Sequence, residues 1–117
     1  MLIVGLDSDG SIRLSKGAGR PVFTQKVRLE VISELSSVDY VFGIRRILDF
    51  TDKEADVYYR DITKRLSPDF IITHSQKDRF ISAKNIRARE LGIRPLVYRS
   101  ASDLSSTEVV EEIMRLG

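Results

Sequence analysis

Cysteine is absent from the 117 residues of the chain, which excludes disulfide bridges and metal sites built on thiolates. Histidine occurs once, at position 74, so a metal site of nitrogen ligands would lack a second imidazole. Apolar runs are short: none approaches the roughly 20 residues that span a bilayer. No basic segment precedes the first apolar residues, as it would in a signal peptide. We therefore expect a cytoplasmic protein with no membrane partner and no metal held by its own side chains.

A large excess of charge of one sign is also missing. The net charge is only +2, although 31% of the residues are charged, so composition does not indicate a nucleic-acid partner. With 42% apolar residues, the chain fits one globular domain covering residues 1–117. The charges are unevenly placed, however. Five cations and no acid occur between Ser11 and Arg28, which indicates either a local anion site or a solvated loop.

Short apolar segments alternate with segments of helical periodicity. The first, Leu2–Leu6, ends at an Asp-Ser-Asp-Gly turn and is typical of a buried strand. Ser8–Pro21, which contains three glycines, is expected to form a loop. The alternation predicts an α/β fold, with a parallel sheet covered by helices on both faces. Further strands are expected over 38–42, 70–73 and 95–98. Helices are expected over 24–36, 80–91 and 105–116. One more helix is expected to begin after a cap at Thr51 or Asp52 and to end at 66.

The helix that begins at Thr24 carries an apolar stripe of Val27, Val31 and Leu35, which is expected to face the core. Arg28 lies on the flank of this stripe. Its side chain is therefore expected either to extend into solvent or to reach back toward the basic loop before the helix.

Parallel sheets bind ligands at the carboxyl ends of their strands, so the loops after the first, third and fourth strands are expected to carry any chemistry. His74 follows the third strand, where a lone histidine is more often a polar loop residue than a catalyst. Asp7 and Asp9 follow the first strand. They would hold magnesium through a bound phosphate or serve simply as turn formers, and turn formation is the commoner role.

The basic loop reads Lys16-Gly17-Ala18-Gly19-Arg20-Pro21. Glycines let backbone amides approach a phosphate closely, and the side chains of Lys16 and Arg20 would neutralise its charge. Composition alone favours a solvated surface loop over such a site. The spacing matches neither a P-loop nor a dinucleotide-binding fingerprint.

The last helix opens with Ser105, Ser106, Thr107 and Glu108. Hydroxyls at a helix N-terminus bind phosphate together with free backbone amides. The same residues also fit a capping box, in which Ser105 is the N-cap and Glu108 lies three residues on. Acidic residues in this helix would repel an anion, and Arg99 would offset them.

Several short motifs follow one another along the chain. Those between Val4 and Ile44 are Ser8-Asp9, Lys16-Gly17, Gly19-Arg20-Pro21-Val22, Arg28 and Val38-Asp39-Tyr40-Val41, and those farther on are Leu66-Ser67-Pro68-Asp69 and Leu104-Ser105-Ser106-Thr107. In this order and spacing the chain resembles the cytidylyltransferase-like nucleotidyltransferases. It is most similar to heptose-phosphate nucleotidyltransferase domains and more distantly to glycerol-phosphate cytidylyltransferases.

The resemblance implies a Rossmann-like fold and a reaction in which a phosphorylated sugar or polyol attacks the α-phosphorus of a nucleoside triphosphate. CTP is the more expected donor and ATP the alternative, with magnesium accompanying the triphosphate and no magnesium ligand assigned to the protein. Pyrophosphate departs. The residues that the resemblance assigns to nucleotide and phosphate binding are Lys16, Arg20, Arg28, Arg99, Ser105, Ser106 and Thr107.

The chain departs from the family at its beginning. The first family strand, its G-T-F-D-like turn and the H-x-G-H helix are missing, so no catalytic residue is assigned, and His74 does not replace the histidine pair. That strand is central in the family fold. Without it, the strands at 2–6 and 70–73 would either keep open edges, which invite partner strands, or pair with each other. We expect either a start roughly 30 to 40 residues upstream, at ordinary strand and helix lengths, or an assembly that fills the gap, including a homo-oligomer.

Three functions remain open from the sequence. The first is nucleotidyl transfer, impaired in this chain because the H-x-G-H segment is absent. The second is a noncatalytic nucleotide-binding or regulatory module that kept the phosphate loops. The third is an interaction domain with an exposed sheet edge and no affinity for nucleotides.

Overall fold

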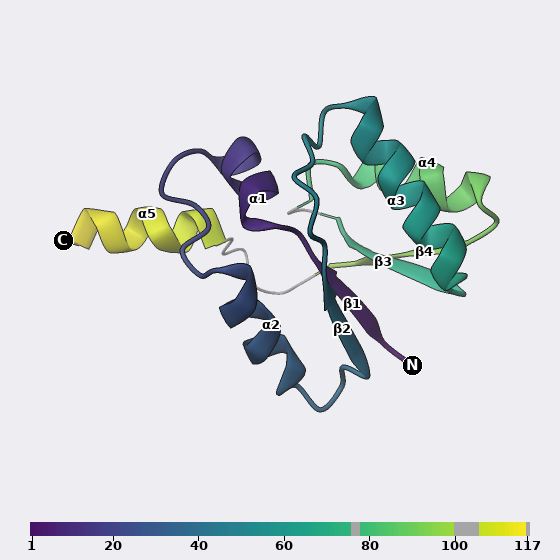
Figure 1. Cartoon of the computed structure of the whole chain (residues 1–117), viewed down its shortest axis with the longest axis horizontal. Helices are drawn as coiled ribbons and strands as arrows, with labels where there is room; N and C mark the ends of the chain where they lie inside the picture. Colours follow the sequence, from purple (N-terminus) through teal and green to yellow (C-terminus); the bar gives the residue numbers. More distant parts are fainter. Residues whose placement is uncertain (76–77, 100–105, 117) are drawn as a thin grey trace. The chain divides into compact units, whose positions relative to one another are not determined.

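The computed structural model describes residues 1–75, 78–99 and 106–116, without the side chains of 106–109 and 112. Strands and helices alternate along the chain, and the strands pair in parallel, which confirms the α/β class (Figure 1). The chain folds into two compact units, Met1–Asp61 and Ile62–Gly117. The elements are β1 (Ile3–Leu6), α1 (Asp9–Lys16), α2 (Gln25–Ser33), β2 (Tyr40–Gly43), α3 (Lys53–Leu66), β3 (Phe70–His74), α4 (Ile81–Glu90), β4 (Arg94–Tyr98) and α5 (Ser106–Leu116).

The first unit is built on the parallel pair of β1 and β2. Ile3 lies opposite Tyr40 and Leu6 opposite Gly43, and the Ile44 amide donates to the Leu6 carbonyl at 2.9 Å. Helix α2 packs against both strands (Figure 1). The buried apolar side chains of this unit, Ile44, Leu48 and Ala55, lie in and after the segment that leaves β2.

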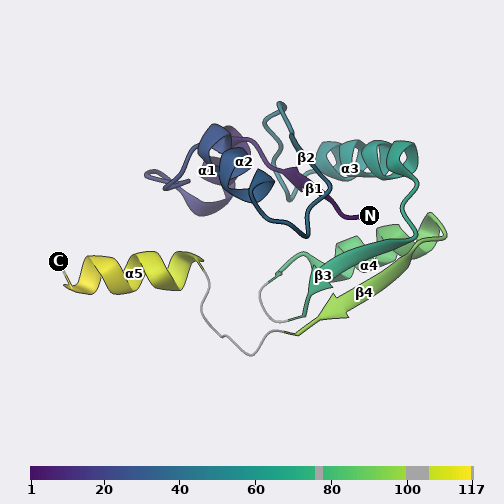
Figure 2. The ribbon, with the colours of Figure 1, turned by 90° about the horizontal axis from the view of Figure 1, so that it is seen from below.

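The second unit repeats this arrangement with β3, β4 and α4. Phe70 lies opposite Arg94, and α4 packs against both strands (Figure 2). Ala88 of α4 is fully buried, and Ile93, just before β4, is 8% exposed. The predicted stop of this helix is confirmed, because Gly92 follows the last turn with φ of 73°, a left-handed conformation that glycine adopts without strain.

One predicted element is wrong. Ser8–Pro21 is not a loop throughout, because α1 occupies Asp9–Lys16. The Ser8 hydroxyl accepts from the Ser11 amide at 3.2 Å and caps the helix, while Gly17, with φ of 93°, ends it. The helix is only eight residues long and its glycine at position 10 weakens helical propensity, so the glycines dominated the prediction.

The apolar stripe of α2 is also placed differently from the prediction. Val27, Val31 and Leu35 are 39%, 59% and 48% exposed, so they do not form the core. Gln25 and Arg28 are less exposed than these three residues, and they lie on the same face of α2 as Ile32. The Gln25 and Arg28 side chains bond to the ends of the strands, and these hydrogen bonds turn the polar residues inward. The cap at Thr24 is confirmed, since its hydroxyl accepts from the Val27 amide.

Each unit contains one parallel strand pair, β1 with β2 in the first and β3 with β4 in the second. Whether β1 and β3 keep open edges or pair with each other stays a prediction. A single domain over residues 1–117 stays a prediction. None of the described helices combines the length and apolar character needed to cross a membrane.

Candidate functional site

The turn between β1 and α1 is tied to the segment after β2 by two buried serines. The Ser8 and Ser11 hydroxyls lie 2.9 Å apart, and both donate to the Arg46 carbonyl, at 2.8 and 3.3 Å. The Ser11 hydroxyl also accepts from the Leu48 amide at 2.7 Å, and Ser11 is 0% exposed. These bonds hold the two segments that leave the carboxyl ends of β1 and β2 in one fixed arrangement, at the sheet edge where ligands bind in such folds.

Gln25, the first residue of α2, closes the same edge. Its side-chain amide donates to the carbonyls of Leu6 and Ile44, at 3.0 and 2.8 Å, so one group satisfies a carbonyl at the end of each strand. Gly43 lets this amide approach, because a Cβ there would lie 2.9 Å from the Gln25 amide carbon. The backbone amide of Gln25 donates to Asp9 Oδ1 at 2.8 Å.

Arg28 reaches back to the β1–α1 turn, which differs from both orientations expected, into solvent or toward the Lys16–Pro21 loop. Its Nη2 donates to the Asp7 carbonyl and to Asp9 Oδ1, both at 2.9 Å, and its Nε donates to the Phe23 carbonyl at 3.1 Å. The ion pair with Asp9 is partly buried, with the Arg28 side chain 21% exposed. Arg28 therefore holds the turn and the start of α2 together, and phosphate binding by this residue stays a prediction.

The two aspartates of the turn are both engaged. Asp9 accepts from Arg28 and Gln25, and Asp7 Oδ1 accepts from the Tyr59 hydroxyl of α3. Among the residues that the structure describes, no cluster of three or more histidine, aspartate or glutamate side chains could hold a metal ion. The carboxylates at this edge thus serve first to fix the backbone.

Two glycines of the basic loop adopt left-handed backbone conformations. Lys16 is the last residue of α1 and is exposed, and Arg20 is half-buried. Gly17 and Gly19 have φ of 93° and 82°, in the left-handed region, and a Cβ on either would meet no atom within 4 Å. The glycines are therefore required by backbone conformation rather than by crowding. An anion bound by this loop stays a prediction.

The remaining predicted site residues belong to the second unit. Arg99 follows β4 and is exposed. Ser105 lies outside the described residues, and Ser106 and Thr107 begin α5 without described side chains. His74 ends β3 with its ring edge-on to Tyr98, at 5.7 Å between centroids. The convergence of Arg99 and the start of α5 with the basic loop stays a prediction.

Sequence reasoning missed the loop after β2. Arg45 and Arg46 follow that strand at the same sheet edge, and the Arg46 guanidinium lies over the Tyr58 ring, 5.3 Å from its centroid. The signal was available, because parallel strands bring the loop after β2 to the edge reached by the loop after β1.

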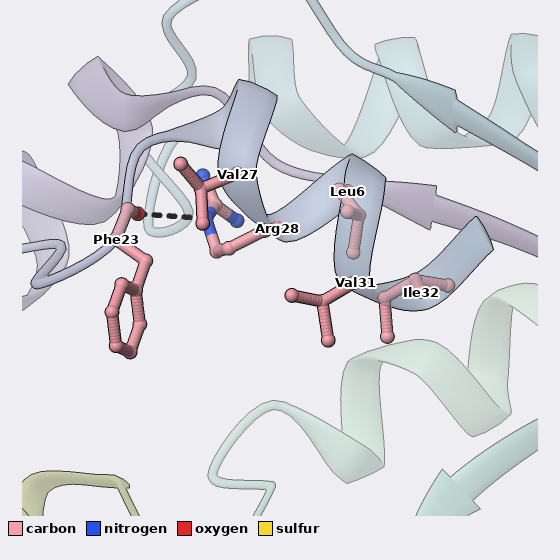
Figure 3. Close-up of a pocket in the computed structure, with 6 residues that line it drawn as sticks. All are labelled: Leu6, Phe23, Val27, Arg28, Val31 and Ile32. Carbon is pink, nitrogen blue, oxygen red and sulfur yellow. Dashed lines mark hydrogen bonds between the residues drawn. The ribbon is translucent and has the colours of Figure 1, made fainter. Parts of the chain in front are cut away.

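An apolar hollow of about 260 Å³ lies beside α2. The Phe23 ring and the Val31 and Ile32 side chains point to the same side of the helix (Figure 3). Among the residues that line the hollow only Arg28 is charged, and its Nε donates to the Phe23 carbonyl (Figure 3). It is lined by Leu6, Phe23, Val27, Arg28, Val31 and Ile32.

The three known proteins compared below with the chain are all bifunctional HldE proteins. No protein-family model matches the chain. The chain is 29% identical, over 97% of its length, to the bifunctional protein HldE of Desulfatibacillum aliphaticivorans, and 34% identical over 82% of its length to that of Hyphomonas neptunium. A shorter match, 52% identical over 34% of the chain, is to the bifunctional protein HldE of Bradyrhizobium diazoefficiens. The chain spans 21%, 18% and 8% of the length of these relatives, so it corresponds to one part of each.

Proposed function

We propose that this chain is a nucleotidyltransferase domain of the cytidylyltransferase-like kind, acting on a phosphorylated sugar. The observation that carries the proposal is the similarity, over 97% of the chain, to the bifunctional protein HldE of Desulfatibacillum aliphaticivorans, taken together with the resemblance of the sequence motifs to heptose-phosphate nucleotidyltransferase domains. The α/β fold with parallel strands supports it. So does the order of the Lys16–Pro21, Leu66–Asp69 and Leu104–Thr107 motifs along the chain.

The donor is CTP or ATP, and the resemblance of the sequence motifs favours CTP. We therefore propose transfer of a nucleotidyl group, CMP or AMP, from the nucleoside triphosphate to a heptose phosphate or a related sugar phosphate.

The reaction joins two anions, so the protein mainly positions groups and neutralises charge. An oxygen of the sugar phosphate attacks the α-phosphorus of the nucleoside triphosphate, the bond between the α-phosphorus and the bridging oxygen breaks, and pyrophosphate leaves with that electron pair. Lys16, Arg20 and the amides beside Gly17 and Gly19 would bind the triphosphate, with Arg99, Ser106 and Thr107 contacting phosphate at the start of α5. Arg28 keeps the β1–α1 turn in place for them.

Magnesium would accompany the triphosphate. The carboxylates of Asp7 and Asp9 each accept a hydrogen bond within the protein, so we assign no protein ligand and expect phosphate oxygens to hold the ion. When bound, it supplies positive charge to the departing pyrophosphate. The histidine pair of the family has no counterpart in the 117 residues, and His74 lies against Tyr98. We therefore expect nucleotide binding with low turnover from this chain alone.

The test measures ATP binding by calorimetry and pyrophosphate release in the presence of a heptose phosphate, with CTP titrated in parallel to compare the two donors. A Lys16→Gln, Arg20→Gln double variant should weaken ATP binding about tenfold or more, because hydrogen bonds to charged groups contribute about 1.5–3 kcal/mol each. The matched control is Lys53→Gln, Lys64→Gln, which removes the same charge from exposed positions of α3 and should leave binding unchanged.

The outcomes separate the proposed function from its alternatives. Binding of ATP with slow, acceptor-dependent pyrophosphate release supports nucleotidyl transfer. Binding with no release at all, in the longest natural form of the protein, would instead indicate a noncatalytic nucleotide-binding module. An absence of nucleotide binding by the chain would overturn both.

A further inference from the structure

Two arginines leave the carboxyl end of β2, and they differ in how they are held. Arg45 and Arg46 are both exposed. Within the described residues, neither guanidinium forms a hydrogen bond or an ion pair, in contrast to the Arg28 guanidinium, which makes three hydrogen bonds. The donors of the Arg46 guanidinium thus remain available to a ligand at the sheet edge.

The backbone of Arg46 is held in place by hydrogen bonds. Its carbonyl accepts from the hydroxyls of Ser8 and Ser11, and the Leu48 amide two residues on donates to Ser11. Both serines are buried, with exposed fractions of 8% and 0%. A cation on such a segment loses less conformational freedom on binding a ligand than one on a free loop, which favours affinity.

The side chain of Arg46 is also positioned. Its guanidinium lies 5.3 Å from the centroid of the Tyr58 ring, a cation–π contact that uses the face of the ring and none of the five N–H donors. Tyr58 packs edge-on against Tyr59, with ring centroids 6.0 Å apart, and the Tyr59 hydroxyl donates to Asp7. A continuous set of contacts therefore links Arg46 to the β1–α1 turn.

The acidic groups near this edge are engaged elsewhere. Asp9 is paired with Arg28, Asp7 accepts from Tyr59, and Asp49 accepts from the Thr51 hydroxyl and amide. No described carboxylate is paired with Arg46, so its charge is left for an anion.

We propose that Arg46, held on Tyr58, binds a phosphate group at the carboxyl edge of β1 and β2. The planar guanidinium offers two parallel donors to two phosphate oxygens, a geometry that a lysine does not reproduce. The inference rests on the proposed function, because it names a residue that would bind the phosphate of one of the two substrates, the triphosphate or the sugar phosphate.

The experiment compares Arg46→Gln with Arg45→Gln by calorimetry. Arg45 is the matched control, since it is adjacent, exposed and of the same charge, but has no aromatic partner among the described residues. Separate titrations with ATP and with a sugar 1-phosphate identify which phosphate is bound. We expect Arg46→Gln to raise Kd about tenfold for at least one of them. Arg45→Gln should change it less than about threefold, because it removes only a solvent-screened charge.

Two further variants separate binding from folding. Arg46→Lys keeps the charge and should retain only part of the affinity, and Tyr58→Leu keeps the arginine while removing its support and should weaken binding several-fold. Equal losses in Arg45→Gln and Arg46→Gln would overturn the inference, because a general charge effect would then explain both. Unchanged binding of both ligands by Arg46→Gln would also overturn it and leave the proposed function standing. If the unmodified chain bound neither ligand, both the inference about Arg46 and the proposed function would be wrong.

Discussion

Arg28 shows how one side chain can unite three segments. Its guanidinium bonds to the turn after β1, to Asp9 of α1 and to the Phe23 carbonyl before α2. The Arg28 side chain is mostly removed from solvent. If it were replaced, its partners would lose hydrogen bonds that water restores only in part. The sequence placed Arg28 on the flank of an apolar stripe, but it did not show that the side chain bonds to the turn after β1, because that depends on acceptors brought together by the fold.

Replacing Arg28 by glutamine should therefore destabilise the protein by about 1–3 kcal/mol, the range for charge-assisted hydrogen bonds lost from a partly buried site. Urea unfolding followed by circular dichroism measures the change. The matched control is Arg13→Gln, which removes an exposed cation of α1 and should change the free energy of unfolding by less than about 0.5 kcal/mol. Equal effects of the two substitutions would show that the bonds of Arg28 do not stabilise the turn.

A second prediction for a single residue concerns the pKa of the Asp49 carboxyl. The hydrogen bonds from the Thr51 hydroxyl and amide hold the pKa of the Asp49 carboxyl below its ordinary value of 3.8. A depressed folded-state pKa means that its stabilising contribution is present above pH 3.8 and is lost as the pH falls through the folded value. In Thr51→Ala the hydroxyl is gone, so an NMR titration should show a higher Asp49 pKa than in the parent chain, and an unchanged value would contradict this.

Among the elements, the strands and most helices could be predicted, and α1 could not. Short apolar runs between turn residues located all four strands to within two residues at each end, because burial imposes that pattern directly. Helix α1 lacks such a pattern: it is short, contains Gly10, and is held by the bonds of Ser8 and Ser11 to a segment 35 or more residues away. Contacts between residues so far apart in the sequence produce no pattern in the sequence of the helix itself.

The importance of those bonds can be tested in Ser11→Ala. Removing the buried hydroxyl leaves the Leu48 amide without its acceptor, so we expect a loss of about 1–3 kcal/mol in the free energy of unfolding. Amide hydrogen exchange at Leu48 should also become faster. Ser37→Ala, at an exposed position, is the control and should change neither quantity. Unaltered protection of Leu48 would mean that the serine does not anchor this segment.

For the whole molecule, the sequence predicted at which edge of the parallel strands a site would lie, but not which residues contact one another there. Parallel strands predict that ligands bind at their carboxyl ends, and this stays a prediction. The structure shows that hydrogen bonds of Gln25, Arg28 and the two serines fix the backbone at the carboxyl ends of β1 and β2. Which cations are occupied by the protein and which remain available depends on the three-dimensional neighbours. Arg28 is bonded within the protein, whereas Arg46, which the sequence did not single out, keeps its donors available.

The central claim is that this chain binds the phosphates of a nucleotide at its basic loop and at the start of α5. Its most direct test is a titration of the isotope-labelled chain with ATP and magnesium, followed by amide NMR, with adenosine as the phosphate-free control. The account predicts shifts at Lys16–Arg20 and at Ser106 and Thr107 with ATP that adenosine does not produce. Resonances at both places that stay unmoved by ATP, or that move equally with adenosine, would contradict it.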